Sequence, residues 1–168
     1  MENKYPWRQD VEWEKRTKLI AKIIPSYLSV VDLGGGYENL NKYLIKCLYK
    51  SIDKYLCTTD TIVADFNKDE FPDGDYEGQD FDYIVCQGTL EYITDPNNFL
   101  QKIKKYGDVL ILTYRIYEKS PIDRNYYGFE NIRFFLKENG WEIILEKVIE
   151  FDKKIESDRE LLFYCRKM

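Results

Sequence analysis

Three consecutive glycines interrupt an apolar run near the start of the chain and precede a second apolar pattern of different period. The run LSVVDL at residues 28–33 predicts a buried strand, because short apolar runs bounded by turn residues are typical of parallel sheets. Gly34 to Gly36 then predict a sharp turn, since glycine permits positive φ values. Beyond the turn, apolar residues recur at helical spacing: Leu40, Tyr43, Leu44, Cys47 and Leu48. A strand, a glycine turn and a helix in this order predict the opening of an α/β layer fold with a mainly parallel sheet.

The rest of the chain continues the alternation of strands and helices. Further strands are predicted at 49–53, 61–64, 81–86, 109–114, 141–151 and 160–165. Helices are predicted at 11–24, from Asp95-Pro96 to about Lys105, and at 129–138. The charged link at 152–158 suits an antiparallel pairing of the last two strands. A chain of 168 residues has the length of one domain, and we expect residues 1–168 to form a single one.

Two irregular segments, 1–10 and 115–128, fall outside the predicted core. We expect residues 1–16 to serve as an N-terminal lid and 115–128 as a substrate loop. The loop carries three basic residues that could hold an anionic group: Arg115, Lys119 and Arg124. The alternative is an ordinary solvated, charged loop.

The charge balance and the missing histidine exclude several classes of function. The formal charge is −5, from 25 basic and 30 acidic residues. Nucleic-acid binding needs clustered excess positive charge, so no nucleic-acid partner is expected. Without histidine, serine–histidine and cysteine–histidine catalysis are excluded, and acid–base work falls to Asp, Glu, Tyr, Lys or Cys.

The cysteines and the hydropathy pattern predict a cytoplasmic protein with no metal site and no membrane partner. The cysteines are scattered and form no CxxC pair: Cys47, Cys57, Cys86 and Cys165. We expect them to be reduced. Apolar runs such as 109–112 are far shorter than the ~20 residues of a membrane-spanning helix. The amino-terminal MENKYPWRQD lacks the apolar stretch of a signal peptide.

Acidic residues end the second and third predicted strands. Asp53 follows Asp32 by 21 residues, near the ~20-residue offset at which an acid reaches a ribose in nucleotide-binding sheets. Asp65 could accept from an adenine amino group, with Phe66 against the ring. Each acid alone is more often a solvated loop residue or a helix cap, and three glycines alone also fit a tight turn without a ligand. Parallel sheets bind ligands at the carboxyl ends of their strands. The glycine turn followed by the acids Asp53 and Asp65 at successive strand ends therefore predicts an adenosine site.

The glycine pattern limits which nucleotide is expected. A dinucleotide fingerprint, GxGxxG, would need a third glycine where Asn39 stands. The phosphate-binding pattern GxxxxGK[ST] does not occur. An adenosine ligand without phosphates therefore fits better, and a nicotinamide-dependent enzyme is the weaker alternative.

From residue 17 to residue 166 the sequence resembles the class I S-adenosylmethionine-dependent methyltransferases. The resemblance rests on five ordered segments: VVDLGGGYENL (30–40), KSIDKY around Asp53, VADF (63–66), FDYIVCQGTLEYITDPNNFL (81–100) and GFENIRFFLKENGWEIILEKV (128–148). It implies a Rossmann-like, doubly wound seven-stranded sheet of order 3-2-1-4-5-7-6, with strand 7 antiparallel and helices on both faces. Our strand count agrees with this. The sequence departs from the family at Glu38, where a third glycine is usual, and in lacking a histidine near position 92.

The resemblance also implies a cofactor, S-adenosylmethionine, with S-adenosylhomocysteine as product, and roles for individual residues. The implied cofactor-binding residues are Asp32, Gly34, Gly35 and Gly36 at the methionine part, Asp53 at the ribose with Lys54 next to it in the sequence, Asp65 and Phe66 at the adenine, and Gln87 and Gly88 at the cofactor's backbone or near its sulfonium. Glu91 and Tyr92 occupy a place where many members have substrate-facing groups. With Tyr114 they are the candidate catalytic residues, because a hydroxyl acceptor usually needs a base whereas an amine needs only its lone pair.

These observations predict a methyltransferase that acts on a small molecule through an oxygen or nitrogen nucleophile. The alternative from another class is a non-catalytic binding module that keeps the methyltransferase fold. Glu38 and the missing histidine favour that alternative.

Overall fold

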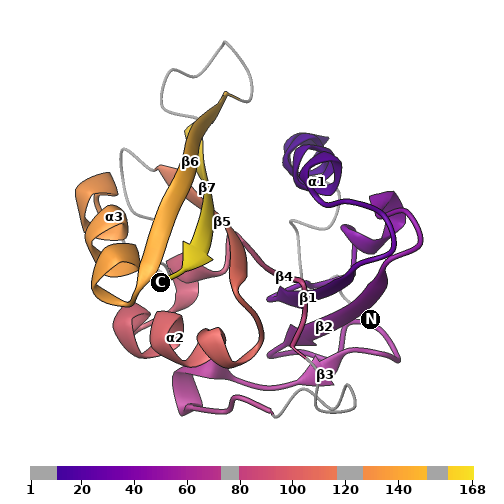
Figure 1. The fold of residues 1–168 in the computed structure, drawn as a ribbon. Coiled ribbons are helices and arrows are strands. Elements are labelled where there is room, and N and C mark those ends of the chain that lie inside the picture. Colours follow the sequence, from indigo (N-terminus) through magenta and orange to yellow (C-terminus); the bar gives the residue numbers. More distant parts are fainter. Residues whose placement is uncertain (1–10, 73–79, 117–126, 151–158) are drawn as a thin grey trace.

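Seven strands form one mixed sheet in a computed structural model that describes residues 11–72, 80–116, 127–150 and 159–168 (Figure 1). The strands are β1 (Ser29–Leu33), β2 (Leu48–Asp53), β3 (Ile62–Val63), β4 (Tyr83–Gln87), β5 (Val109–Ile116), β6 (Trp141–Glu150) and β7 (Arg159–Lys167). Their order is β3-β2-β1-β4-β5-β7-β6. β7 pairs antiparallel with β5 and β6, and the other pairs are parallel. The expected strand order and antiparallel seventh strand are confirmed.

Helices cover both faces of the sheet, as expected. α1 (Val11–Ile23) lies on one face, and α2 (Pro96–Lys102) and α3 (Phe129–Glu138) lie on the other (Figure 1). Side chains that alternate along β1 divide between the faces: Val30 packs with Ile20 of α1, and Val31 packs in the cluster that contains Phe99 of α2. No described helix has both the length and the apolar composition needed to cross a membrane.

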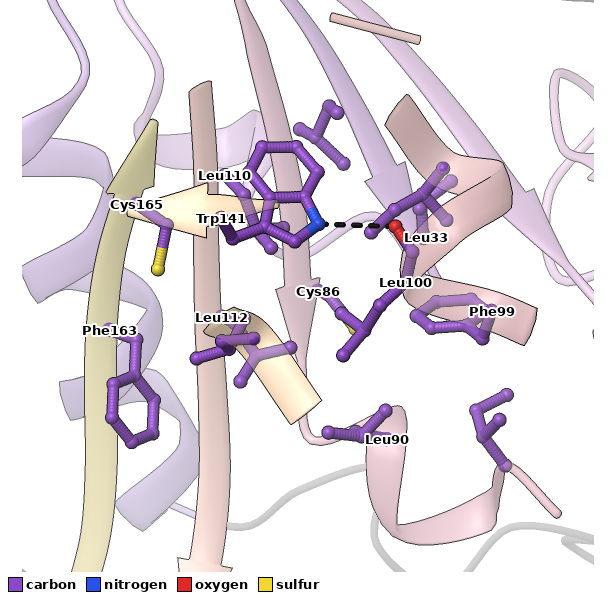
Figure 2. Close-up of a cluster of buried hydrophobic side chains, with 14 of the residues drawn as sticks. Leu33, Cys86, Leu90, Phe99, Leu100, Leu110, Leu112, Trp141, Phe163 and Cys165 are labelled. Atoms are coloured by element: carbon purple, nitrogen blue, oxygen red, sulfur yellow. Dashed lines mark hydrogen bonds between the residues drawn. The ribbon is translucent and has the colours of Figure 1, made fainter. Parts of the chain in front are cut away.

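The larger core cluster joins the end of the chain to its middle (Figure 2). Trp141, the first residue of β6, is fully buried, and its indole Nε1 donates to the Leu100 carbonyl at 3.1 Å. The bond satisfies a donor that burial would otherwise leave unpaired. Asp95 caps α2 by accepting from the backbone N–H of Asn98 at 3.0 Å, as its position before Pro96 predicts.

The prediction of a helix after the glycine turn is wrong. That stretch contains only a single 3₁₀ turn, Asn41–Tyr43. Glu38 (φ +56°) and Lys46 (φ +54°) adopt left-handed backbone conformations, which an α-helix cannot contain. The apolar spacing still has a packing role, because Leu40 is fully buried.

Several predicted features lie outside the described residues. They are the N-terminal segment 1–10, most of the loop 115–128 including Lys119 and Arg124, and the link 152–158. The remainder of the expected lid belongs to α1.

Candidate functional site

The glycine turn is held tightly against its neighbours on one side and is open on the other. A Cβ on Gly34 would lie 2.1 Å from Oγ1 of Thr89, and a Cβ on Gly35 would lie 2.5 Å from Oγ of Ser51. Thr89 Oγ1 in turn donates to the Leu33 carbonyl at 2.8 Å. A Cβ on Gly36 would meet no atom within 4 Å. Packing therefore requires the first two glycines, while the third leaves the backbone accessible.

Asp53 lies directly beside this open part of the turn. Its Oδ2 accepts from the backbone N–H of Gly36 at 3.0 Å, and its Oδ1 accepts from the N–H of Tyr55 at 3.0 Å. The turn and the acid of β2 thus meet, as the sequence predicts. Lys54, the next residue, is exposed, and its Nζ lies 5.3 Å from the centre of the Tyr55 ring.

Asp32 is a fully buried carboxylate under the turn. Its Oδ2 accepts from the Tyr49 hydroxyl at 2.8 Å and from Gln87 Nε2 at 3.0 Å, whereas its Oδ1 has no hydrogen-bond partner among the described residues. Burial raises the pKa of Asp32 to about 6, against the two hydrogen bonds, which lower it. Burial also raises the pKa of Tyr49, and the nearby Asp32 charge adds to that shift. The site thus contains one buried acidic oxygen that is free to accept.

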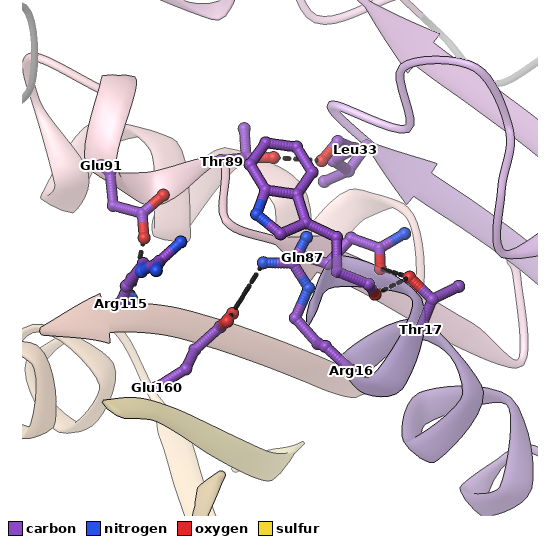
Figure 3. A network of polar contacts seen from close by, with 9 residues as sticks. Arg16, Thr17, Leu33, Gln87, Thr89, Glu91, Arg115 and Glu160 are labelled. Carbon is purple, nitrogen blue, oxygen red and sulfur yellow. Dashed lines mark hydrogen bonds and ion pairs between the residues drawn. The ribbon is translucent and has the colours of Figure 1, made fainter. Parts of the chain in front are cut away.

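Gln87 and Gly88 connect the glycine turn to α1. Thr17 Oγ1 lies 3.2 Å from Gln87 Oε1 (Figure 3). Through its other terminal atom, Nε2, Gln87 donates to Asp32. Gly88 has φ +70°, and a Cβ there would lie 3.0 Å from Nη1 of Arg16 and 3.3 Å from Oε2 of Glu91. Both residues lie at the carboxyl end of β4, beside β1, as expected.

Asp65 and Phe66 follow β3 at the same edge of the sheet, but their side chains are engaged locally. Asp65 accepts from the N–H of Asn67 at 3.1 Å and so caps a short 3₁₀ turn. Phe66 is buried, with ring centroids 5.2 Å from Phe71 and 5.3 Å from Phe99. The ring has a packing role in this arrangement, which speaks against its predicted place beside an adenine ring. A bond from Asp65 to an adenine amino group stays a prediction.

The three candidate catalytic residues do not converge. Glu91 is buried beside Gly88, and its Oε1 accepts from the N–H of Arg115 at 2.7 Å. Tyr92 is 39% exposed. Tyr114 is 1% exposed and belongs to the core cluster on the α2 and α3 face, where its hydroxyl accepts from the N–H of Tyr127 at 2.7 Å. Because Tyr114 points to the face opposite Gln87, the geometry speaks against it as a base.

Some residues of the site escaped the sequence analysis. Five residues that were not predicted contact the site or its neighbours: Arg16, Thr17, Tyr49, Thr89 and Glu160. For Tyr49 a signal exists, because alternation along β2 places it on the same side of the strand as Asp53. The pairing of Arg16 with Glu160 bridges 144 sequence positions, and no local pattern predicts it.

Comparisons with known proteins agree with this architecture. A family model described as a methyltransferase domain matches residues 7–148. The structure is similar to a TehB-like SAM-dependent methyltransferase from Corynebacterium glutamicum, with 16% identity, a TM-score of 0.68, and coverage of 96% of this chain and 90% of that one. No curated protein sequence matches the chain.

Two further proteins of similar structure are methyltransferases named for very different acceptors. A Burkholderia thailandensis 1,6-didemethyltoxoflavin-N1-methyltransferase, solved with 1,6-didemethyltoxoflavin and S-adenosylhomocysteine bound, is 12% identical with a TM-score of 0.71 over 96% of this chain and 80% of that one. The small RNA methyltransferase HEN1 is 14% identical with a TM-score of 0.68 over 93% of this chain and 25% of that one. The shared fold thus serves different acceptors. Together with the family match over most of the sequence, it shows that the chain belongs to the methyltransferase domain family and has the class I fold.

Proposed function

We propose that this protein transfers a methyl group from S-adenosylmethionine to the oxygen or nitrogen of a small-molecule acceptor. The observation that carries the proposal is the meeting of the Asp53 carboxylate with the Gly36 N–H on the open side of the glycine turn, above the buried Asp32. A glycine backbone, a ribose-binding acid and a second acid form a suitable site for an adenosine that carries a cationic side chain.

The described residues fit this cofactor. Asp32 Oδ1 has no hydrogen-bond partner in the described part of the chain and suits an ammonium or another donor. Asp53 accepts from the backbone and retains acceptor capacity for ribose hydroxyls. The remaining residues assigned to the cofactor are Gly34, Gly35, Lys54, Asp65, Gln87 and Gly88, with Phe66 as packing support.

The bound cofactor supplies an activated methyl group on a sulfonium. The residues of this chain bind and orient it, and they hold the acceptor in line while water is excluded, an effect of ~7–11 kcal/mol in favourable cases. Glu91 is the better placed candidate base, because its carboxylate lies beside Gly88. Tyr92, partly exposed next to it, is assigned to the acceptor.

Charge and cysteine chemistry support the small-molecule acceptor and a cytoplasmic location. A formal charge of −5 disfavours a polyanionic acceptor such as RNA. The structure, where it describes the chain, places none of the four cysteines in a disulfide, which suits a reducing compartment. We assign residues 1–168 to one domain, with no membrane partner.

A second candidate is a binding module without catalysis, and Glu38 favours it. This residue replaces the usual third glycine and brings a third carboxylate close to the turn. For this second candidate, a carboxylate there would repel the carboxylate of a bound methionine group and lower the affinity without abolishing binding. The second candidate would bind the cofactor and transfer nothing.

Calorimetry with S-adenosylmethionine and S-adenosylhomocysteine, followed by a turnover assay on a panel of small phenols, amines and heteroaromatics, tests the proposal. We expect binding of both ligands and formation of S-adenosylhomocysteine with at least one acceptor. Binding without turnover on any acceptor would support the module, and absence of binding would overturn both.

A further inference from the structure

A buried ion pair fixes α1 to the antiparallel part of the sheet. Nη1 of Arg16 donates to both carboxylate oxygens of Glu160, at 2.9 and 3.2 Å, and the two side chains are 6% and 1% exposed (Figure 3). Glu160 lies on β7 opposite Arg115 of β5. The guanidinium also lies over the Trp13 ring, 5.2 Å from its centre. Desolvation offsets much of the attraction between buried charges, so such a pair is weak evidence for stability. It does tie Arg16 of α1 to Glu160 of β7, on the face where Ile20 of α1 packs in the core.

A second polar connection leads from α1 to the glycine turn. The buried Thr17 hydroxyl lies 3.2 Å from Gln87 Oε1, and Gln87 Nε2 donates to Asp32. The same hydroxyl lies 2.8 Å from the Trp13 carbonyl, and its single hydrogen serves one acceptor at a time. When the hydroxyl donates to Gln87 Oε1, it favours the amide orientation in which Gln87 presents its N–H groups to Asp32.

α1 also borders the end of β4 directly. The Cβ position of Gly88 lies 3.0 Å from Nη1 of Arg16 and 3.3 Å from Oε2 of Glu91. Arg16 and Thr17 thus contact two successive residues, Gln87 and Gly88, that are assigned to the cofactor. The contacts reach the site from a helix that lies outside the segments assigned to the cofactor.

We propose that α1 is a positioning element of the cofactor site, in which Arg16 docks the helix and Thr17 orients Gln87 toward Asp32. This inference rests on the proposed function, because it assumes that the glycine turn binds the cofactor. Coupling between two sites is reciprocal: if docking of α1 strengthens cofactor binding, the cofactor must stabilise the docked helix by the same amount.

The sharpest test replaces the Thr17 hydroxyl without changing the volume of the side chain. Thr17→Val removes the hydroxyl, Thr17→Ser keeps it, and Lys18→Gln changes an exposed ion pair of the same helix as the matched control. With S-adenosylhomocysteine as probe in calorimetry, we expect about a tenfold higher Kd for Thr17→Val, the effect of one buried hydrogen bond. Thr17→Ser and Lys18→Gln should stay within twofold of the wild type.

Hydrogen exchange separates positioning from a purely structural role. In the wild type, S-adenosylhomocysteine should slow amide exchange in residues 11–23, and Thr17→Val should reduce that slowing while its unliganded Tm stays close to the wild-type value. Arg16→Lys, which keeps the charge opposite Glu160 but not the guanidinium geometry, should weaken binding as well.

Two results would overturn the inference and leave the methyltransferase proposal standing. One is wild-type affinity in Thr17→Val with no ligand effect on exchange in α1. The other is a Thr17→Val variant whose affinity falls together with its Tm, combined with a Thr17→Ser variant that also binds weakly. A wild-type protein that fails to bind S-adenosylhomocysteine would overturn both proposals together.

Discussion

The carboxylate of Glu38 accepts a hydrogen bond from the hydroxyl of Thr58, in the connection between β2 and β3, although Glu38 itself has a left-handed backbone. Its Oε1 also lies 3.4 Å from the Thr61 hydroxyl. A non-glycine residue in this conformation costs ~1–2 kcal/mol, which the side-chain hydrogen bonds offset. Glu38 thus links the glycine turn to the loop that follows Asp53.

Replacing Glu38 by the glycine that is usual in the family should therefore weaken cofactor binding. Glu38→Gly relieves backbone strain but releases Thr58 and Thr61, so we expect little change in Tm and a several-fold higher Kd for S-adenosylhomocysteine by calorimetry. Glu38→Gln, which keeps an acceptor oxygen for the threonines, serves as the control and should bind close to the wild type. Tighter binding by Glu38→Gly would mean that the Glu38 carboxylate repels the cofactor instead of supporting its site.

Removing the Asp53 carboxylate should cost cofactor affinity directly. We expect Asp53→Ala to lose ~1–3 kcal/mol of binding free energy, because a charged acceptor for the ribose and for the Gly36 N–H disappears. Isothermal titration with S-adenosylhomocysteine measures the loss. Asp60→Ala changes an exposed acid of the following loop and should leave affinity unchanged. Equal affinities for the two variants would rule out the ribose assignment.

The buried Asp32 should make stability fall as the pH rises. Its folded-state pKa of about 6 lies above the ordinary value of 3.8, so between these values the folded protein holds a proton that the unfolded chain has released. The Asp32 contribution to stability is therefore present at low pH and is lost as the pH rises through about 6. The charges that face it act in opposite directions, since Arg16 lowers the pKa and Asp53 raises it.

The variant Asp32→Asn tests the direction in which stability changes with pH. Its Tm should exceed that of the wild type at pH 8, and the difference should shrink toward pH 4, as thermal unfolding across this range would measure. The same variant should bind S-adenosylmethionine more weakly at pH 8, because the negative charge is gone. A Tm difference that does not vary with pH would contradict a raised pKa for Asp32.

The first and third glycines should respond differently to an added methyl group. Both have positive φ, +77° at Gly34 and +53° at Gly36, but only at Gly34 would the Cβ overlap with Thr89. Gly36→Ala should cost ~1 kcal/mol for the backbone alone. Gly34→Ala should cost ~2–4 kcal/mol, since the overlap adds ~1–3 kcal/mol. Urea unfolding of the two variants measures both losses of unfolding free energy. Equal losses would show that the Thr89 side chain moves aside to accommodate the new methyl group.

Trp141 provides a prediction about stability away from the site. Trp141→Phe keeps an aromatic ring but removes the N–H that bonds to the Leu100 carbonyl, and it leaves a small cavity. We expect a loss of ~2–3 kcal/mol in unfolding free energy with no change in Kd for S-adenosylhomocysteine. A change in affinity would show that the packing between β6 and α2 reaches the cofactor site.

The sequence by itself determined the strands, the sheet class and the place of the glycine turn. These follow from short-range rules: apolar runs such as 28–33 form strands, Asp95-Pro96 starts a helix, and parallel strands bring Asp32 and Asp53 to one edge. The antiparallel seventh strand needed the family resemblance as well, because strand order is not a local property.

Only the tertiary structure decided which side chains face the site. The side chains of Tyr114 and Phe66 lie in the core. The stretch after the turn is not a helix, and Glu38 within it has a left-handed backbone conformation. Arg16 pairs with Glu160, 144 positions further along the chain. Burial, pairing and side-chain direction depend on what packs on each face of the sheet. That packing is settled by contacts between distant segments, which periodicity along the chain does not encode.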